Sequence, residues 1–163
     1  MAVRHVLIKR PPHAVWSVLS DGSTYADWVV GTSTTHEADA NWPAVGSAIT
    51  YTVKLGPLDL HNRTVVRVNE LESRLELEAY AGVLGTARIA IEIRPWGDDS
   101  LVVVDEHPLR GPGARLHNTV VDAAIMLRHR SMLDRFAEAV ERLTPPAPDS
   151  TPATETAQPT PSP

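Results

Sequence analysis

From Thr32 to Leu109, apolar and polar residues alternate along the chain with a period of two. Such alternation is typical of strands that bury one face and expose the other. Turn-forming segments interrupt it at short intervals, which predicts antiparallel neighbours. These segments are residues 41–43, 56–57, 72–73, 82 and 97–98. The side chains expected on the buried face are Ile49, Tyr51 and Val53; Leu58, Leu60, Asn62, Thr64, Val66 and Val68; Leu75, Leu77 and Ala79; and Ala87, Ile89, Ile91 and Ile93.

The flanking segments have a different pattern. Residues 3–10 form a short β-branched run that predicts the first strand. Pro11 and Pro12 suit the first turn of a short helix, and a second short helix ends at Gly31. Residues 114–143 contain no glycine or proline and predict one long helix. Its apolar stripe consists of Val121, Ile125, Met132, Phe136, Val140 and Leu143.

The apolar stripe of the long helix and the apolar face of the sheet can bury each other. The order of the elements therefore predicts an α+β helix-grip fold. In this fold a curved antiparallel sheet of six or seven strands wraps around the long C-terminal helix, and two short helices follow the first strand. The domain is expected to span residues 1–143. Residues 144–163 are rich in Pro, Thr, Ala and Ser and predict a disordered tail.

Several motifs within residues 3–143 resemble those of a known family. They are Val15-Trp16 with Leu19-Ser20-Asp21-Gly22, Tyr25 with Trp28-Val29-Val30-Gly31, the run from Asn41 to Ser47, Gly56-Pro57-Leu58, Glu106 with Gly111-Pro112-Gly113, and the segment from Arg128 to Phe136. The chain resembles the SRPBCC (START/Bet v 1-like) superfamily, and within it the actinobacterial polyketide cyclase/dehydrase and lipid-transport-like group. His129 stands where asparagine is usual. The resemblance implies a cavity between sheet and long helix, which relatives use as cyclases, lipid carriers or ligand sensors.

Composition and charge limit the classes of partner and the cellular location that fit this chain. The net charge of −5 and a pI near 5.8, with dispersed arginines, argue against nucleic acid as a partner. The chain has no cysteine, and its first residues lack the apolar stretch of a signal peptide, so a cytoplasmic protein is expected. The longest apolar run is too short for a membrane span. No metal site is expected, because His117 and His129 lie about 120° apart around a helix. No cofactor is expected, and the segment from Gly111 to Leu116 fails the dinucleotide-binding fingerprint because Leu116 replaces its third glycine. The oligomeric state is left open.

Candidate ligand-binding residues come from aromatic and polar positions in predicted core regions. Trp28 and Tyr25 lie in the short-helix region that closes one end of the cavity in such folds, and Trp42 lies in a loop that suits a lid. Tyr51, Asn62 and Thr64 fall on the inward parity of their strands, where buried polar groups need partners. Each of these residues has a structural alternative, which is core packing, a turn or a bond to neighbouring backbone.

Candidate ionisable residues are fewer. Glu106 and His107, next to Asp105, form the densest cluster and suggest proton transfer. Adjacent strand residues point to opposite faces, however, so these two cannot both face inward without a bulge. The facing of residues 101–108 is left open, because the segment is apolar on both parities. His129 lies near the apolar stripe of the long helix and is a further candidate for ligand contact.

Two function classes follow. The first is binding or carriage of a small hydrophobic molecule, such as a lipid or polyketide-like compound, in the cavity. The second is a polyketide cyclase/aromatase-like enzyme that uses acid/base residues there. Binding is favoured, because catalysis needs a positioned acid or base inside the cavity and the candidates have ambiguous facing. Whether the protein is an enzyme therefore remains open at this stage.

Overall fold

The computed structural model describes residues 2–30, 32–55, 58–80, 85–110 and 119–146. For Ala2 and residues 33–37, 54–55, 58, 60, 108, 110 and 119–130 it describes the backbone alone. The elements in chain order are β1 (Ala2–Ile8), α1 (Pro12–Leu19), the 3-10 helix η1 (Gly22–Thr24), α2 (Tyr25–Trp28), β2 (Thr32–Ala38), β3 (Ala48–Leu55), β4 (Leu58–Glu70), β5 (Arg74–Tyr80), β6 (Thr86–Trp96), β7 (Asp99–Arg110) and α3 (Thr119–Leu143).

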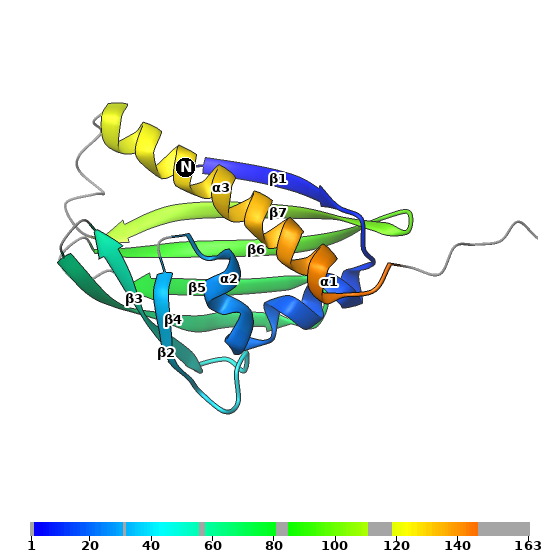
Figure 1. The fold of residues 1–163 in the computed structure, drawn as a ribbon, viewed down its shortest axis with the longest axis horizontal. Helices are drawn as coiled ribbons and strands as arrows, with labels where there is room; N and C mark the ends of the chain where they lie inside the picture. Colours follow the sequence, from blue (N-terminus) through cyan, green and yellow to red (C-terminus); the bar gives the residue numbers. More distant parts are fainter. Residues whose placement is uncertain (1, 31, 56–57, 81–84, 111–118, 147–163) are drawn as a thin grey trace, which may run out of the picture.

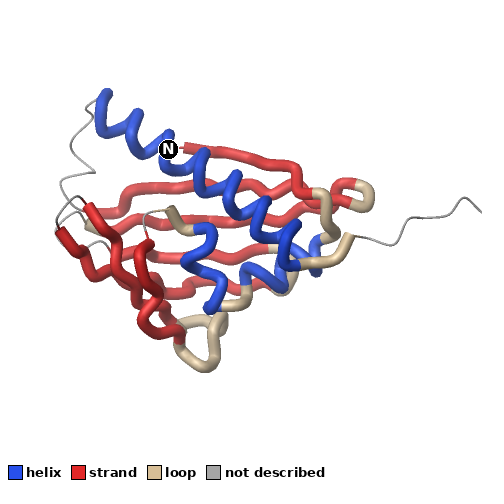
Figure 2. Tube along the Cα trace, viewed as in Figure 1, coloured by secondary structure: helices blue, strands red, loops and turns tan. Residues whose placement is uncertain are grey.

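The strands form one seven-stranded antiparallel sheet in the order β1-β7-β6-β5-β4-β3-β2. Figure 1 shows α3 crossing one face of this sheet diagonally, with α1 and α2 beside it on the same face. The tube in Figure 2 shows the same arrangement of helices against strands. We call the helix-covered face the inner face and the opposite one the outer face. The predicted helix-grip fold is confirmed.

The short helices follow from local sequence. Pro12 lies in the first turn of α1, where its missing amide donor costs little, and α1 turns Val15 and Leu19 into the core. The Asp21 carboxylate then accepts a bond of 2.9 Å from the Ser23 amide and caps η1. These turns bring Tyr25 and Trp28 over the inner face.

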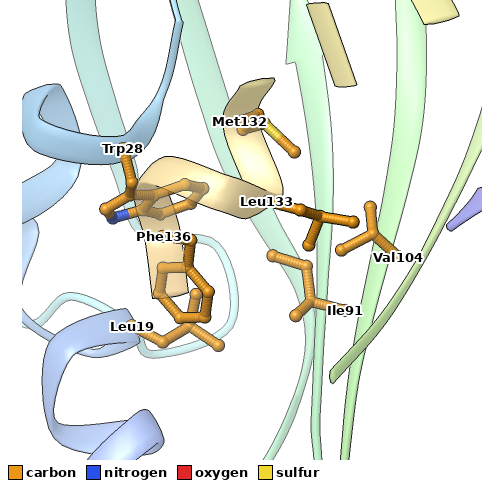
Figure 3. A pocket seen from close by; sticks show the side chains of 7 residues that line it. All are labelled: Leu19, Trp28, Ile91, Val104, Met132, Leu133 and Phe136. Atoms are coloured by element: carbon orange, nitrogen blue, oxygen red, sulfur yellow. The ribbon is translucent and has the colours of Figure 1, made fainter. Parts of the chain in front are cut away.

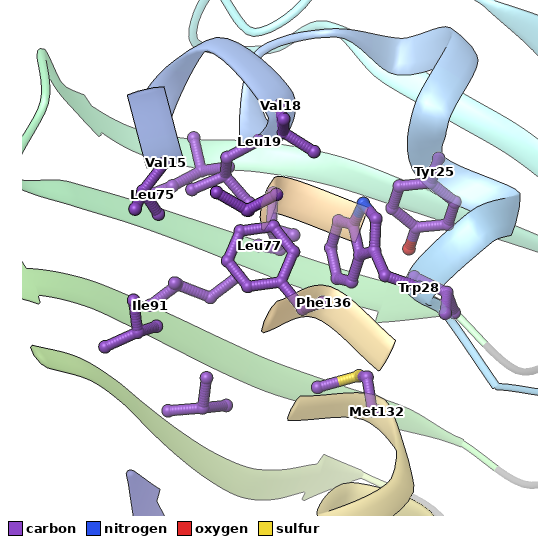
Figure 4. Close-up of a cluster of buried hydrophobic side chains, with 14 of the residues drawn as sticks. Val15, Val18, Leu19, Tyr25, Trp28, Leu75, Leu77, Ile91, Met132 and Phe136 are labelled. Atoms are coloured by element: carbon purple, nitrogen blue, oxygen red, sulfur yellow. The ribbon is translucent and has the colours of Figure 1, made fainter. Parts of the chain in front are cut away.

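The core lies between the inner face and the helices (Figure 4). Among the described side chains of α3, those that are buried are Met132, Leu133, Phe136, Ala139 and Val140. Leu143, expected at the end of the apolar stripe, is instead 48% exposed, because it is the last residue of α3 and no further turn of the helix covers it. Val121 and Ile125 of the expected stripe lie outside the described side chains.

A β-bulge in β4 changes the predicted facing of one strand. Val66 pairs with Leu77 on the inner face, but the register shifts at Arg67, so Val68 pairs with Glu76 on the outer face. The prediction that Val68 faces inward was therefore wrong. Asn69 takes the inner position beyond the bulge, and its Nδ2 donates to the carbonyl of Pro43 at 2.7 Å. This bond ties β4 to the loop that precedes β3.

Candidate functional site

Cross-strand pairing arranges the inner face in rows. One row runs through Val66, Leu77, Ile89 and Glu106, and the next through Leu75, Ile91, Val104 and Arg4. Paired residues on one face have Cβ atoms about 5 Å apart, so each row forms a continuous strip. The strips are apolar across β4 to β6 and end in charged residues on β7 and β1. The inner face is therefore an apolar floor with a charged margin along one edge.

The second half of α3 packs closely on this floor. The cavity between them has a volume of about 10 Å³ and an entirely apolar lining (Figure 3). Its lining consists of Leu19, Trp28, Ile91, Val104, Met132, Leu133 and Phe136. A space of this size holds at most about one water molecule, whereas ligand pockets span about 300–1,000 Å³. Beneath the described side chains of α3, the interior is thus filled by the protein itself.

Three buried hydroxyl groups meet at the β3–β4 side of the core. The Tyr25 hydroxyl lies 3.0 Å from Thr64 Oγ1, and Thr64 Oγ1 donates to the Tyr51 hydroxyl at 3.3 Å. Thr64 is fully buried, and both tyrosines are at most 4% exposed. We call Tyr25, Thr64 and Tyr51 the hydroxyl cluster. Its members satisfy one another, so the partners of Thr64 are tyrosine hydroxyls and not neighbouring backbone.

Aromatic rings surround the hydroxyl cluster. The Tyr25 ring lies 5.2 Å from the rings of both Trp28 and Tyr51, and 6.3 Å from the ring of Trp42. Trp28 in turn meets Phe136 of α3 edge to face, at 5.2 Å. Edge-to-face pairs of this kind add stability beyond area burial. The aromatic residues of the short-helix region therefore form a packed cluster that joins α2, β3 and α3.

Three buried polar atoms near this cluster have no hydrogen-bond partner. Asn62 pairs with Tyr51 across β3 and β4 on the inner face, and its Oδ1 is buried and unbonded. The indole Nε1 atoms of Trp28 and Trp42 are likewise buried and unbonded. Leaving such groups unpaired costs about 1–3 kcal/mol each. They therefore mark the side of the interior where an added polar group would gain most.

The ionisable candidates separate onto two faces. The His107 Nε2 lies 2.8 Å from Asp105 Oδ2, and both side chains are on the outer face. Glu106 pairs with Ile89 and shares the inner parity of the buried Val104. The side chain of His129 lies outside the described residues. The open facing of β7 is thus resolved, with Glu106 inside and His107 outside.

The outer face carries a buried carboxylate that sequence reasoning missed. Glu76 is 6% exposed and accepts bonds from Arg88 at 2.5 and 2.9 Å, and it also contacts Arg74. The hydrogen bond from Arg88 lowers the pKa of Glu76 below its ordinary value of 4.5, and the charges of Arg88 and Arg74 lower it further. The alternation predicts that Glu76 is exposed, because it does not reveal that Arg74 and Arg88 cover this side chain.

Arg4 is a second residue that the sequence analysis missed. It shares the inner parity of β1 with the half-buried Val6 and the fully buried Ile8, whereas Val3 is 53% exposed. Its Nε is buried without a partner. Residues 3–8 are apolar on both parities, apart from Arg4 and His5, so the pattern could not decide which of these two lies inside.

A metal site finds no support in the described part of the chain, where no three His, Asp or Glu side chains gather. None of the described helices is long and apolar enough to cross a membrane. The sequence model of one family, described as "Polyketide cyclase / dehydrase and lipid transport", matches residues 2–141. The chain belongs to this family. The motif resemblance noted from the sequence is therefore confirmed.

Solved structures of similar shape agree with this family's fold. The Zhui aromatase/cyclase from Streptomyces sp. R1128 is 13% identical, with a TM-score of 0.65 over 86% of this chain and 93% of its own. A protein from Arthrobacter aurescens is 11% identical, with a TM-score of 0.68 over 96% of this chain and 91% of its own. DynU16, from the dynemicin biosynthetic locus, is 19% identical, with a TM-score of 0.64 over 91% of this chain and 49% of its own.

At these identities the likeness shows the fold alone. A search of curated proteins found no significant sequence match. The family description names both cyclase/dehydrase and lipid-transport members, so family membership points to hydrophobic ligands without choosing between carriage and catalysis.

Proposed function

We propose that this family member binds a small hydrophobic molecule of the lipid or polyketide type between the inner face of the sheet and α3. One observation carries the choice of binding over catalysis: Glu106 and His107 lie on opposite faces, so the described interior holds no carboxylate–imidazole pair. The polar groups around Tyr51 are hydroxyls, an amide and indoles. Such groups orient a ligand by hydrogen bonds and stay uncharged at neutral pH.

The binding volume is placed beneath the first half of α3, residues 119–130. The second half already fills the floor over Ile91 and Val104, leaving about 10 Å³. Figure 1 shows the start of α3 on the same side of the molecule as the end of β3. Asn62 lies near that end, opposite Tyr51. A ligand that extends from beneath the first half of α3 across the inner face to β4 would meet the unbonded amide oxygen.

Asn62 is the proposed polar anchor of this site. Its Oδ1 accepts hydrogen bonds, so it is suited to a ligand hydroxyl. Tyr51 and Thr64 are already bonded within the hydroxyl cluster and hold the strand beside Asn62 in place. Trp28, Tyr25 and Trp42 form the aromatic wall next to it. His129 remains a proposed ligand contact.

Native mass spectrometry of protein purified from its own host tests the proposal. We expect a bound small molecule that is released on denaturation and recovered chemically unchanged after incubation with excess protein. The released compound should bind Asn62→Ala at least about tenfold more weakly than wild type, as loss of one well-placed hydrogen bond predicts. Asn41→Ala, a matched change in an exposed loop, should bind like wild type. Conversion of the compound by the protein would contradict a purely binding role.

The alternative is a cyclase/aromatase-like enzyme. Glu106 favours it, because its inward position leaves one carboxylate able to serve as an acid or base. In that case Glu106→Gln would abolish conversion of the co-purified compound while leaving its binding measurable. A binder shows no conversion in either protein.

A further inference from the structure

The hydrogen bonds of the hydroxyl cluster have one direction. Thr64 Oγ1 donates to the Tyr51 hydroxyl at 3.3 Å, and a threonine hydroxyl has a single proton to donate. The contact of 3.0 Å between Tyr25 and Thr64 therefore uses the proton of Tyr25. The chain of bonds runs from Tyr25 through Thr64 and ends at Tyr51.

Tyr51 keeps its own hydroxyl proton. In the cluster its hydroxyl acts as an acceptor, and within the described part of the chain no group takes its proton. The Tyr51 side chain is buried, with 4% of the residue exposed. A hydroxyl that accepts one hydrogen bond donates more strongly in the next, because bonds in a chain polarise one another. The cluster thus ends in a buried donor that lacks an acceptor.

Asn62 supplies an acceptor beside this donor. It lies directly opposite Tyr51 across β3 and β4, on the same face of the sheet. The Cβ atoms of such a pair are about 5 Å apart. The Asn62 Oδ1 is buried and has no hydrogen-bond partner. A donor proton and an acceptor oxygen, each without a partner, therefore extend from neighbouring positions of the inner face.

The inner face next to this pair is lined by small residues. Thr64, Ala79 and Ala87 form one row across β4, β5 and β6, and this row lies two rows away from that of Ile91. Ala79 and Ala87 are partly exposed although they face inward, whereas Leu75, in the row of Ile91, is fully buried. Figure 1 shows the end of β5 on the same side of the molecule as the start of α3. The row of Ala79 and Ala87 thus offers space for a ligand outside the filled part of the interior.

From this geometry we propose that Tyr51 and Asn62 together bind a hydroxyl group, and that the ligand is an alcohol or a phenol. The ligand oxygen accepts the Tyr51 proton, the ligand proton goes to Asn62 Oδ1, and the apolar body lies along Ala79 and Ala87. A hydroxyl group supplies both functions from one atom, whereas a ketone or an ether has no proton to donate. The inference rests on the proposed function, because it assigns the polar group of a ligand bound on the inner face.

The experiment compares alcohols with the matched ketones. Octan-2-ol and octan-2-one probe an aliphatic body, and 2-tetralol and 2-tetralone probe a bicyclic one. Each is titrated by calorimetry into wild type, Asn62→Leu, Tyr51→Phe and Ala79→Leu. Asn41→Leu in an exposed loop and Tyr80→Phe on the outer face are the matched controls.

For at least one body type, we expect wild type to bind the alcohol about tenfold or more tightly than the ketone, because the ketone has no proton for Asn62. Asn62→Leu should lose this preference, since the alcohol then binds as weakly as the ketone. Tyr51→Phe should weaken both compounds and keep the preference. Ala79→Leu should weaken both equally by filling the space for the ligand body, and the two controls should match wild type.

Thermal unfolding of each variant shows whether it is folded, and Asn62→Ala takes the place of Asn62→Leu if the latter is not. Two outcomes overturn the inference in distinguishable ways. If wild type binds alcohol and ketone equally, or if the Asn62 variant keeps the preference, the hydroxyl site is wrong while hydrophobic binding stands. A water molecule that stays bound between Tyr51 and Asn62 would give this result. If wild type binds none of the four compounds, hydrophobic binding on the inner face fails and the hydroxyl site fails with it.

Discussion

Glu106 and His107 are consecutive residues of β7, yet their side chains lie on opposite faces of the sheet. The register of β7 with β6 is unbroken from Ala87 to Trp96, so no bulge brings the two together. His107 instead bonds Asp105 on the outer face at 2.8 Å. The two residues therefore have independent environments and cannot act as one acid–base pair.

A pair of single substitutions tests this separation. His107→Gln should leave the affinity for the co-purified ligand within about twofold of wild type, because an outer-face change leaves the inner contacts intact. Glu106→Gln should change that affinity, since it removes a charge from the inner face. Calorimetric titration of both variants gives the comparison. Loss of binding in His107→Gln alone would contradict the assignment of faces.

Much of the fold could be predicted from the sequence, because period and turn chemistry decide it locally. The alternation through Leu75 and Leu77 put both on the inner face, where both are buried. The alternation failed at Val68, because a bulge inserts Arg67 and reverses the parity beyond it. A single bulge leaves no period of its own in a sequence.

The candidate site could be predicted only in part. Tyr25 was singled out as an aromatic candidate and Tyr51 and Thr64 as polar positions, and the structure joins the three through hydroxyl contacts of 3.0 and 3.3 Å. The sequence pattern did not identify Arg4 or Glu76, because the environment of each is formed by neighbours on other strands. Cross-strand pairing depends on the whole topology, and it cannot be read from the residues flanking one position.

The hydroxyl cluster provides a test of buried hydrogen bonding. Thr64→Val keeps the shape of the side chain but leaves the hydroxyls of Tyr25 and Tyr51 without Thr64 Oγ1. We expect the free energy of unfolding to fall by about 1–3 kcal/mol, the cost of leaving buried polar groups unsatisfied. Thr64→Ser keeps the hydroxyl and removes only a methyl group, so its loss should be smaller, about 1 kcal/mol. Urea unfolding monitored by circular dichroism measures both variants. Equal losses would show that packing, and not hydrogen bonding, governs this position.

Glu76 predicts a defined pH dependence of stability. Its hydrogen bond from Arg88 holds its pKa below the ordinary value of 4.5, so the unfolded chain binds more protons in that range. The resulting stabilisation is present above the unfolded pKa and is lost as the pH falls through the lower, folded pKa. Near neutral pH, the free energy of unfolding of Glu76→Gln should be about 1–2 kcal/mol lower than that of wild type. The partial exposure of Arg74 and Arg88 keeps this difference small.

This difference between wild type and Glu76→Gln should shrink as the pH falls from about 7 to about 3, because protonation of Glu76 makes the two proteins alike. Urea unfolding at several pH values across this range provides the measurement. Glu92→Gln is the matched control, since Glu92 contacts Arg94 on the outer face and is 38% exposed. The free energy of unfolding of Glu92→Gln should fall by no more than about 0.5 kcal/mol. A difference for Glu76→Gln that stays constant with pH would contradict the assigned role.

Arg10 bonds the last turn of α3 and the residue that follows the helix. Arg10 Nε donates to the carbonyl and the hydroxyl of Thr144 at 3.1 and 3.2 Å, and Nη2 donates to the carbonyl of Glu141 at 2.8 Å. The Thr144 hydroxyl also donates to the carbonyl of Val140 at 2.6 Å. Thr144, which the composition assigned to the tail, is therefore bonded to the domain. The remainder of the predicted disordered tail, from residue 147 to residue 163, lies outside the described part of the chain.

Truncation after Pro146 and substitution of Arg10 test separately the contribution of the tail and that of the bonded end of α3. For a chain ending at Pro146, the free energy of unfolding should lie within about 0.5 kcal/mol of that of the full-length protein, as the predicted disorder of the Pro/Thr-rich tail implies. Arg10→Met keeps much of the side-chain volume but leaves the last carbonyls of α3 without their donor, and should cost about 1–2 kcal/mol. Lys9→Met, one residue earlier at an exposed position, is the matched control, and only its backbone amide bonds Glu141. Thermal and urea unfolding of the three variants provide the test. A large loss on truncation at Pro146 would place the domain boundary further along the chain. No loss in Arg10→Met would show that its bonds to Thr144 and Glu141 do not stabilise the end of α3.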